Sequence, residues 1–276
     1  MEEVSVVFLW LAFLLFGAAF AVFLYHLFSA RRSLNRLGVI ITAVGWSCLT
    51  ASLVLRGLSA GHVPGVGAYE SLTLAVWAFV TIYVVVEALT SVKAVGLYVT
   101  PIADFFLGLA LIFYEAPAAL VPDLKSDLVI VHRIVIFSAL GAFFIAGGAA
   151  VIYLIEAWQL KKSKHAGPLL GRLPSLATLD QLIYHSILFG LPLLTMTIVT
   201  GHIQTQVLHI PHWWTDPLPA LALVVWLIYA VFLYGHFRHG WRGKIAARFA
   251  IVGVIGLCAI RAVALVGLSN FHNWGQ

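Results

Sequence analysis

Histidines are the residues of this chain best suited to chemistry. The sequence holds eleven of them, beside only 16 lysines and arginines and 11 acidic residues. Neutral imidazole is the commonest side-chain ligand of haem iron, and two histidines from different helices can hold one porphyrin between them. A polar side chain inside a membrane is costly, so a histidine within an apolar segment often has a function. For any single histidine, an interfacial hydrogen bond to a neighbouring helix is an equal alternative.

The other reactive residue types form no recognisable catalytic motif. Cys48 and Cys258 lie in apolar runs and no CxxCH is present, so we expect no disulfide framework, cysteine metal site or covalent haem attachment. A P-loop, a GxSxG motif, a dinucleotide fingerprint and an HExxH zinc motif are absent from the sequence. His209 and His212 have a metal-binding spacing, but only Asp216 lies near enough in sequence to complete a site. The sequence thus has no independent catalytic motif, and whether the chain is an enzyme stays open.

The elements that must position the histidines are membrane-spanning helices. The chain is 62% hydrophobic and 10% charged, which is too apolar for a soluble domain. About 20 apolar residues cross a bilayer as a helix, because backbone groups in lipid must be satisfied within the segment. We predict an all-α, polytopic integral membrane bundle of about eight transmembrane helices in a single domain, residues 1–276. The expected helices are 4–29, 38–59, 70–92, 94–114, 127–157, 178–201, 218–238 and 247–269.

The basic residues predict the orientation of this bundle. Twelve of the 16 fall in connections on one side, which makes that side cytoplasmic and places both termini outside. They are Arg31, Arg32, Arg36, Lys93, Lys161, Lys162, Lys164, Arg172, Arg238, Arg242, Lys244 and Arg248. This distribution indicates a multi-pass protein of a bacterial-type inner (plasma) membrane, in contact with lipid, and argues against nucleic acid as a partner.

Two outer histidines are the preferred haem ligands. His132 lies at the start of the fifth predicted helix and His272 just after the eighth, at the same depth. Such a pair predicts an axial ligand set for haem iron at the outer face.

Arginines near the outer face have two interpretations. Arg133, Arg56 and Arg261 could neutralise haem propionates, since guanidinium binds carboxylates through two parallel hydrogen bonds. Alternatively, these arginines extend to the interface or pair with Asp104 or Glu70.

Three further histidines lie near the inner ends of helices. His26 is near the end of the first, His185 near the start of the sixth and His236 at the end of the seventh. Any two could form a second haem site near the cytoplasmic leaflet, although inner histidines beside basic loops are commonly just solvated.

Four segments of the chain together resemble a known family. They are GHVPGVGAYESL (residues 61–72), LIYHSILFGLPLLTMTIVTG (182–201), WWTDPLPALALVVWLIYAVFLYGHFRHGWRGK (213–244) and the closing FHNW. In this order they resemble the cytochrome c assembly family, which includes CcsA, CcmC and HemX-like membrane proteins. The resemblance covers residues 38–276.

The resemblance implies a haem-handling protein. CcsA members receive haem and present it outside the membrane for attachment to apocytochrome c. Family members ligate external haem with two histidines that flank a tryptophan-rich loop, and these positions match His132 and His272. The loop matches Trp213, Trp214 and Asp216, on which haem could rest.

This chain departs from the family pattern at two places. The signature WGxxWxWDxxxT lacks its earlier tryptophan and its terminal threonine here. The family's inner histidine falls on Tyr234, two residues before His236. Both changes favour the HemX-like branch over a full CcsA synthase.

The leading hypothesis is a membrane protein that presents haem b at the outer face for cytochrome c assembly, with a second inner haem left open. Partners would be haem, a CcsB-like protein, apocytochrome c or other membrane subunits. One alternative is a b-type haem electron-transfer subunit of a respiratory complex. The other is a HemX-like non-catalytic regulator or scaffold. A transporter for another small molecule ranks last, because no broken-helix pattern supports it.

Overall fold

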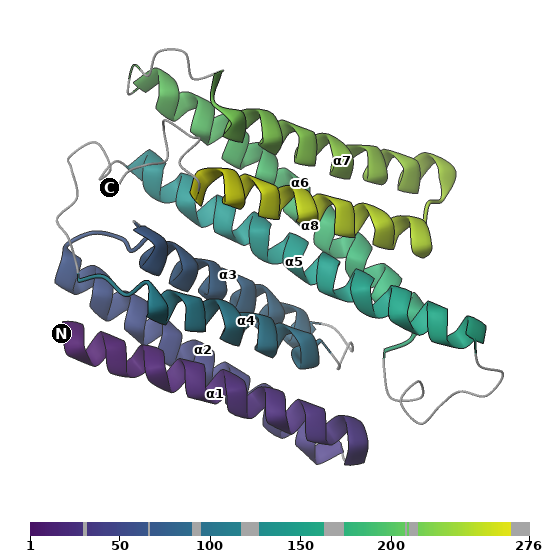
Figure 1. The fold of residues 1–276 in the computed structure, drawn as a ribbon, viewed down its shortest axis with the longest axis horizontal. Coiled ribbons are helices and arrows are strands. Elements are labelled where there is room, and N and C mark those ends of the chain that lie inside the picture. The colour runs from purple at the N-terminus through teal and green to yellow at the C-terminus, as the bar shows by residue number, and fades with distance from the viewer. Residues whose placement is uncertain are drawn as a thin grey trace. The chain divides into compact units, whose positions relative to one another are not determined.

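A computed structural model describes residues 1–29, 32–65, 67–89, 95–116, 127–162, 174–207, 209 and 215–265 of the chain. Regular structure in these ranges is helical (Figure 1). The helices are α1 (Glu2–Ser29), α2 (Arg32–Ala60), α3 (Gly67–Leu89), α4 (Gly96–Ile112), α5 (Asp127–Lys162), α6 (Leu176–Val207), α7 (Pro217–His239) and α8 (Lys244–Leu265). The predicted all-α fold is confirmed, with eight helices among the described residues.

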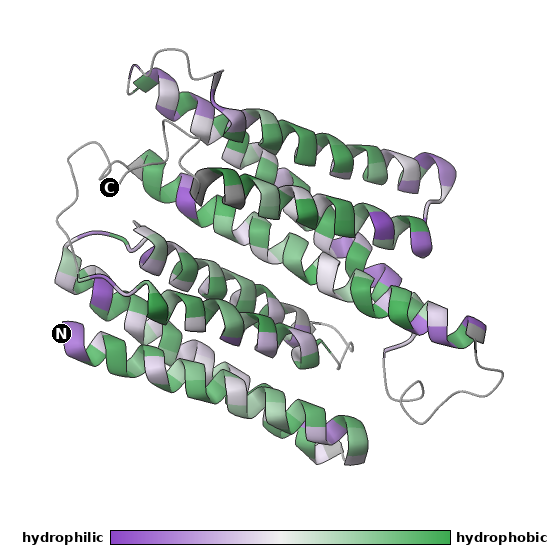
Figure 2. Ribbon diagram, in the orientation of Figure 1, coloured by the Kyte–Doolittle hydropathy of each residue, from purple (hydrophilic) through white to green (hydrophobic). Residues whose placement is uncertain are grey.

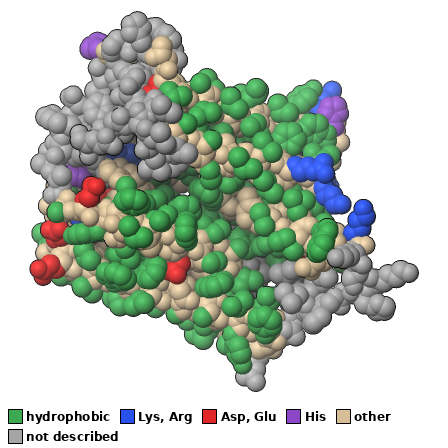
Figure 3. Space-filling view, viewed as in Figure 1, with side chains coloured by type: hydrophobic (Ala, Val, Ile, Leu, Met, Phe, Trp, Pro, Cys, Tyr) green, Lys and Arg blue, Asp and Glu red, His purple; other side chains and the backbone are tan. Residues whose placement is uncertain are grey.

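Apolar side chains cover the outer faces of these helices as well as their cores. Trp10, Leu14, Phe105, Leu227 and Phe237 are each at least 49% exposed. Figure 2 shows the helix bodies to be mostly hydrophobic, and Figure 3 shows hydrophobic side chains over much of the visible described surface. Soluble proteins rarely expose so much contiguous apolar surface. Among the described helices, α1, α2, α3, α5, α6 and α7 have the length and composition to cross a membrane, so the chain is a multi-span membrane protein.

The helices form two compact units. Unit 1 comprises Met1–Leu120 and Ile155–Thr178, and unit 2 comprises Val121–Leu154 and Leu179–Gln276. Unit 1 therefore contains α1 to α4. Unit 2 contains the first part of α5, most of α6, and α7 and α8.

Two tryptophans connect α2 and α3 within unit 1. Trp46 Nε1 donates a hydrogen bond to Thr81 Oγ1 (2.8 Å), and Trp77 Nε1 donates to Thr50 Oγ1 (2.9 Å). Each threonine hydroxyl in turn donates to the main-chain carbonyl of the tryptophan on its own helix. This reciprocal arrangement satisfies polar groups inside apolar helices, where an unmade hydrogen bond would be costly.

An aromatic stack forms the core of unit 2. The rings of Phe143 (α5) and Tyr229 (α7) are parallel, with centroids 4.1 Å apart. Gly190 on α6 faces the Phe143 ring, and Gly253 on α8 lies against the Tyr229 ring. An added Cβ at either glycine would overlap an aromatic side chain. Small residues thus let four helices approach one stack, as is common inside membranes.

The ends of α6 and α7 refine the predicted segmentation. The sequence placed the end of the sixth helix at Gly201, but α6 continues to Val207, because a single glycine weakens a helix without breaking it. Asp216 begins α7 as its N-cap: its Oδ1 accepts a hydrogen bond from Leu218 N at 2.9 Å. Gly240 ends α7 in a left-handed conformation (φ 67°), which glycine adopts without strain.

Candidate functional site

His132 lies near the start of α5 and reaches across to α6. Its Nδ1 is 2.9 Å from Thr200 Oγ1. The Thr200 hydroxyl is also 2.8 Å from the Met196 carbonyl and 3.1 Å from the Thr197 carbonyl on its own helix. The imidazole is partly buried. The structure therefore provides His132 with a side-chain partner, Thr200, that sequence reasoning did not identify.

Two further features hold the His132 ring at this junction. Gly201 lies beside it, and a Cβ built on Gly201 would be 3.2 Å from His132 Cε1. Gln204 Nε2 donates to the Leu128 carbonyl at 3.3 Å, which links the last turns of α6 to the first turn of α5. The start of α5 is thus tied to the end of α6.

The rest of the predicted outer site is described only in part. His272, Trp213 and Trp214 lie outside the described residues. Arg133 is partly buried beside His132 in the sequence. The Asp216 side chain is buried and caps α7, as above. Of the two predicted outer ligands, His132 is the one that lies within the described residues.

His236 occupies the other end of unit 2. Its Nδ1 is 2.8 Å from the carbonyl oxygen of Trp241, and its ring stacks on Tyr184 of α6 with centroids 4.1 Å apart and an interplanar angle of 14°. Because a carbonyl oxygen only accepts, Nδ1 carries a proton, and in a neutral imidazole the lone pair is then on Nε2. That is the protonation state required of a neutral metal ligand.

His185 lies against the same tyrosine. Its Nδ1 is 2.8 Å from the carbonyl of Gln181, one turn earlier on α6, and its ring meets Tyr184 edge-on at 5.0 Å. The same argument assigns the His185 proton to Nδ1. The structure thus brings two of the three predicted inner histidines to one aromatic ring. The third, His26, lies in unit 1, on the last turns of α1.

The turn between α7 and α8 supports the position of His236. Asp180 Oδ1 accepts a hydrogen bond from Gly243 N at 2.6 Å, and Trp241 N donates to the Gly235 carbonyl at 3.3 Å. Gly235 has room for no side chain, because an added Cβ would overlap the Trp241 indole. The sequence analysis did not identify this turn, although the glycines on both sides of Trp241 and Arg242 could have indicated it; spacing offers no signal for its partner Asp180.

Basic side chains gather around this turn. Arg238, Arg242, Lys244 and Arg248 are all exposed there. Figure 3 shows lysine, arginine and histidine side chains at the end where α7 and α8 meet in Figure 1. His132 and His236 are therefore at opposite ends of unit 2. Along α6 alone, the distance from His185 to Thr200 is about 22 Å at 1.5 Å per residue.

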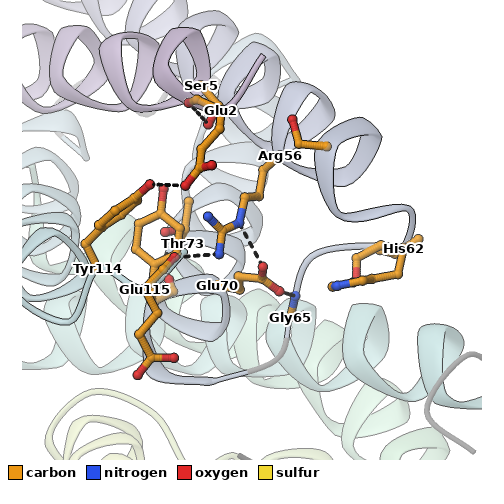
Figure 4. Close-up of polar contacts among 12 residues, drawn as sticks. Glu2, Ser5, Arg56, His62, Gly65, Glu70, Thr73, Tyr114 and Glu115 are labelled. Atoms are coloured by element: carbon orange, nitrogen blue, oxygen red, sulfur yellow. Dashed lines mark hydrogen bonds and ion pairs between the residues drawn. The ribbon is translucent and has the colours of Figure 1, made fainter. Parts of the chain in front are cut away.

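Unit 1 contains a buried ion pair rather than an open site. Arg56 Nε lies 2.9 Å from Glu70 Oε1, and the two residues are 3% and 4% exposed (Figure 4). Arg56 Nη2 donates to the Glu115 carbonyl at 2.7 Å, and Glu70 Oε2 accepts from Gly65 N at 2.9 Å. The Tyr69 ring lies 4.9 Å from the guanidinium carbon, a cation–π distance. The sequence left two roles open for Arg56, namely neutralising a haem propionate or pairing with an acidic residue. The structure shows the pairing, with Glu70.

Comparison with known proteins supports the resemblance read from the motifs. A family model described as Cytochrome C assembly protein matches residues 66–262, well over half of the chain. The chain belongs to the cytochrome c assembly family. The match includes α3 to α7, most of α8, His132 and the two histidines around Tyr184.

Curated relatives within this family extend the match to nearly the whole chain. A protein named Cytochrome c biogenesis protein CcsA from Synechococcus sp. (strain CC9902) is 31% identical over 294 residues, covering 94% of each chain. Proteins of the same name from Parasynechococcus marenigrum (strain WH8102) and Guillardia theta are 30% and 29% identical. They cover 94% and 83% of this chain and 95% and 83% of their own lengths. These relatives are CcsA proteins, and they give no support to the closer placement with the HemX-like branch.

Proposed function

We propose that this protein binds haem at the His132 end of unit 2 and presents it to an apocytochrome c during cytochrome c assembly. His132 and His272 are the axial ligands in this proposal, and Trp213 and Trp214 offer an aromatic surface to the porphyrin. The proposal depends most on one observation, the contact of His132 with Thr200 where α5 begins and α6 ends. This contact occurs in a chain that belongs to the cytochrome c assembly family.

The donor chemistry at this junction fits haem iron. A metal-binding imidazole commonly has its second nitrogen engaged in a hydrogen bond that fixes its orientation, as Thr200 does for His132. Gly201 leaves space at the ring. When bound, haem supplies the vinyl groups that react with the partner's cysteines. The chain's own residues bind it, orient it and keep an edge open to the partner; Arg133 is proposed to balance a propionate.

The charge distribution supports an orientation for unit 2. The exposed Arg238, Arg242, Lys244 and Arg248 favour the cytoplasmic side for the α7–α8 turn. The His132 end then faces outward, where c-type cytochromes are assembled. We infer a bacterial-type plasma membrane as the location, with both termini outside, and a CcsB-like protein and apocytochrome c as partners.

Transmembrane electron transfer by b-type haems is a second candidate function. One observation favours it: the end opposite His132 also carries imidazoles, His185 and His236, whose Nδ1 atoms are bonded to carbonyls. A second haem held by these two side chains at the inner face would complete a two-haem path. Redox titration separates the two functions, since electron transfer requires two low-spin haems that exchange electrons.

Pyridine haemochrome quantification of the detergent-solubilised full chain tests the proposal. We expect about one haem per chain, and loss of most of it in His132→Ala and in His272→Ala. His202→Ala is the matched control, because His202 is exposed on the same end of α6 and is not a proposed ligand. Full haem content in His132→Ala would overturn the proposal, as would equal losses in the control.

A further inference from the structure

We propose that Thr200 and Gly201 are positioning residues: Thr200 selects the tautomer of His132, and Gly201 sets the place of its ring. This inference rests on the proposed function, in which His132 binds haem iron. It assigns roles to two residues of α6 that do not themselves touch the metal.

The hydrogen-bond geometry around Thr200 decides the location of the proton. A threonine hydroxyl has one proton to donate, and Oγ1 lies within 2.8 Å of the Met196 carbonyl and 3.1 Å of the Thr197 carbonyl. Both carbonyls only accept, and the 2.8 Å approach of the Met196 oxygen to Oγ1 requires the hydroxyl proton between those two oxygens. Toward His132 Nδ1, at 2.9 Å, Thr200 must then accept. His132 consequently carries its proton on Nδ1 and its lone pair on Nε2.

This tautomer matters for a metal ligand. Nε2 is the nitrogen at the far end of the ring, and an imidazole that donates Nδ1–H to an oxygen is both oriented and more basic. Without an acceptor at Thr200, the ring could rotate about its χ2 angle or protonate Nε2 instead. Thr200 therefore preorganises the ligand before haem arrives.

Gly201 acts by size. It lies inside α6, where its backbone is helical, so no unusual conformation requires a glycine. Glycine is a poor helix former, and its presence here needs another reason. A Cβ added at Gly201 would be 3.2 Å from His132 Cε1 and 3.7 Å from His132 Nδ1. Among the described residues, the His132 ring is therefore the group that this Cβ would contact. Alanine at this position would favour the helix but push the ring.

Three variants test the proposal in the full-length protein. Thr200→Val keeps the shape but removes the acceptor, and we expect haem affinity to fall about 10- to 100-fold, the range for partners of metal ligands. We also expect the reduction potential of any remaining haem to rise, because a less basic imidazole stabilises ferric iron less. Thr200→Ser should restore both properties. Thr205→Val is the control, since its hydroxyl makes the same type of bond, to the His202 carbonyl.

Gly201→Ala separates positioning from stability. We expect a melting temperature equal to or above that of the wild type, with haem affinity at least tenfold lower. If Thr200→Val does not fold, this variant and Thr200→Ser decide the outcome. Unchanged haem affinity and reduction potential in Thr200→Val, or in Gly201→Ala where the valine variant does not fold, would overturn the inference.

His132→Ala distinguishes this failure from failure of the proposed function. If His132→Ala loses haem but Thr200→Val and Gly201→Ala behave as wild type, only the positioning roles are wrong. If His132→Ala keeps its haem, the proposed function itself is wrong.

Discussion

The buried polar cluster of unit 1 and the histidines of unit 2 use hydrogen bonds in different ways. Arg56 and Glu70 bind each other and nearby main-chain atoms, and both side chains are almost completely closed to solvent. His132, His185 and His236 each have Nδ1 within hydrogen-bond distance of an oxygen, which fixes the orientation of the ring. The first arrangement holds segments together, whereas the second orients an imidazole.

A difference also exists among the histidines. His185 and His236 donate to main-chain carbonyls, so their tautomers are built into the backbone. His132 depends on a hydroxyl side chain, Thr200, and a single substitution can remove its partner. At the His132 end, a change in sequence can therefore most easily alter the orientation of the proposed ligand.

The largest loss of stability is expected from breaking the ion pair of unit 1. Glu70→Ala leaves the Arg56 guanidinium buried without its counter-charge, which typically costs about 3–5 kcal/mol. Thermal unfolding in detergent measures the effect. The double variant Arg56→Met with Glu70→Met should be less destabilised than Glu70→Ala, because it buries no charge. A double variant that is worse than the single one would contradict a cluster whose role is structural.

A smaller loss is expected at the α7–α8 turn. Asp180→Ala removes the acceptor of Gly243 N, and a partly buried amide left unsatisfied costs about 1–3 kcal/mol. Asp180→Asn keeps an acceptor oxygen and is the matched control. Haem bound through His132 should keep its absorption spectrum in both variants, since the turn is at the opposite end of unit 2. A spectral change would show that the two ends are coupled.

His236→Phe tests the inner histidines with a still smaller effect. The phenyl ring can keep the stack on Tyr184 but loses the bond to the Trp241 carbonyl, for an expected cost of about 0.5–1.5 kcal/mol. In a protein with one outer haem, the haem content should not change. Loss of one of two titrating haems would instead support electron transfer.

The smallest effect is expected for Tyr114→Phe. Tyr114 donates to Glu2 Oε1 at 2.7 Å but is 39% exposed, so its removal should change stability by no more than about 0.5 kcal/mol. Burial and the bond to Glu2 raise the pKa of Tyr114. Its contribution should therefore be present through neutral pH and lost only as pH rises through that raised value. Unfolding midpoints of the two proteins at neutral and alkaline pH check this expectation.

The helices and their approximate ends could be predicted from the sequence, because a bilayer imposes a local rule. Each apolar run must satisfy its own backbone as a helix, so hydropathy alone located the eight helices in the part of the chain that the structure describes. The motifs shared with the cytochrome c assembly family were likewise readable along the chain. Histidines as candidate ligands followed from residue type and depth.

The partners of those histidines were decided only by the tertiary structure. Thr200 is 68 residues from His132, and in the sequence it is an ordinary threonine of an apolar helix. Asp180 likewise supports a turn 63 residues away. Hydropathy depends on each residue and its near neighbours, whereas tautomer and orientation depend on which atoms of different helices meet. Helix packing alone determines that.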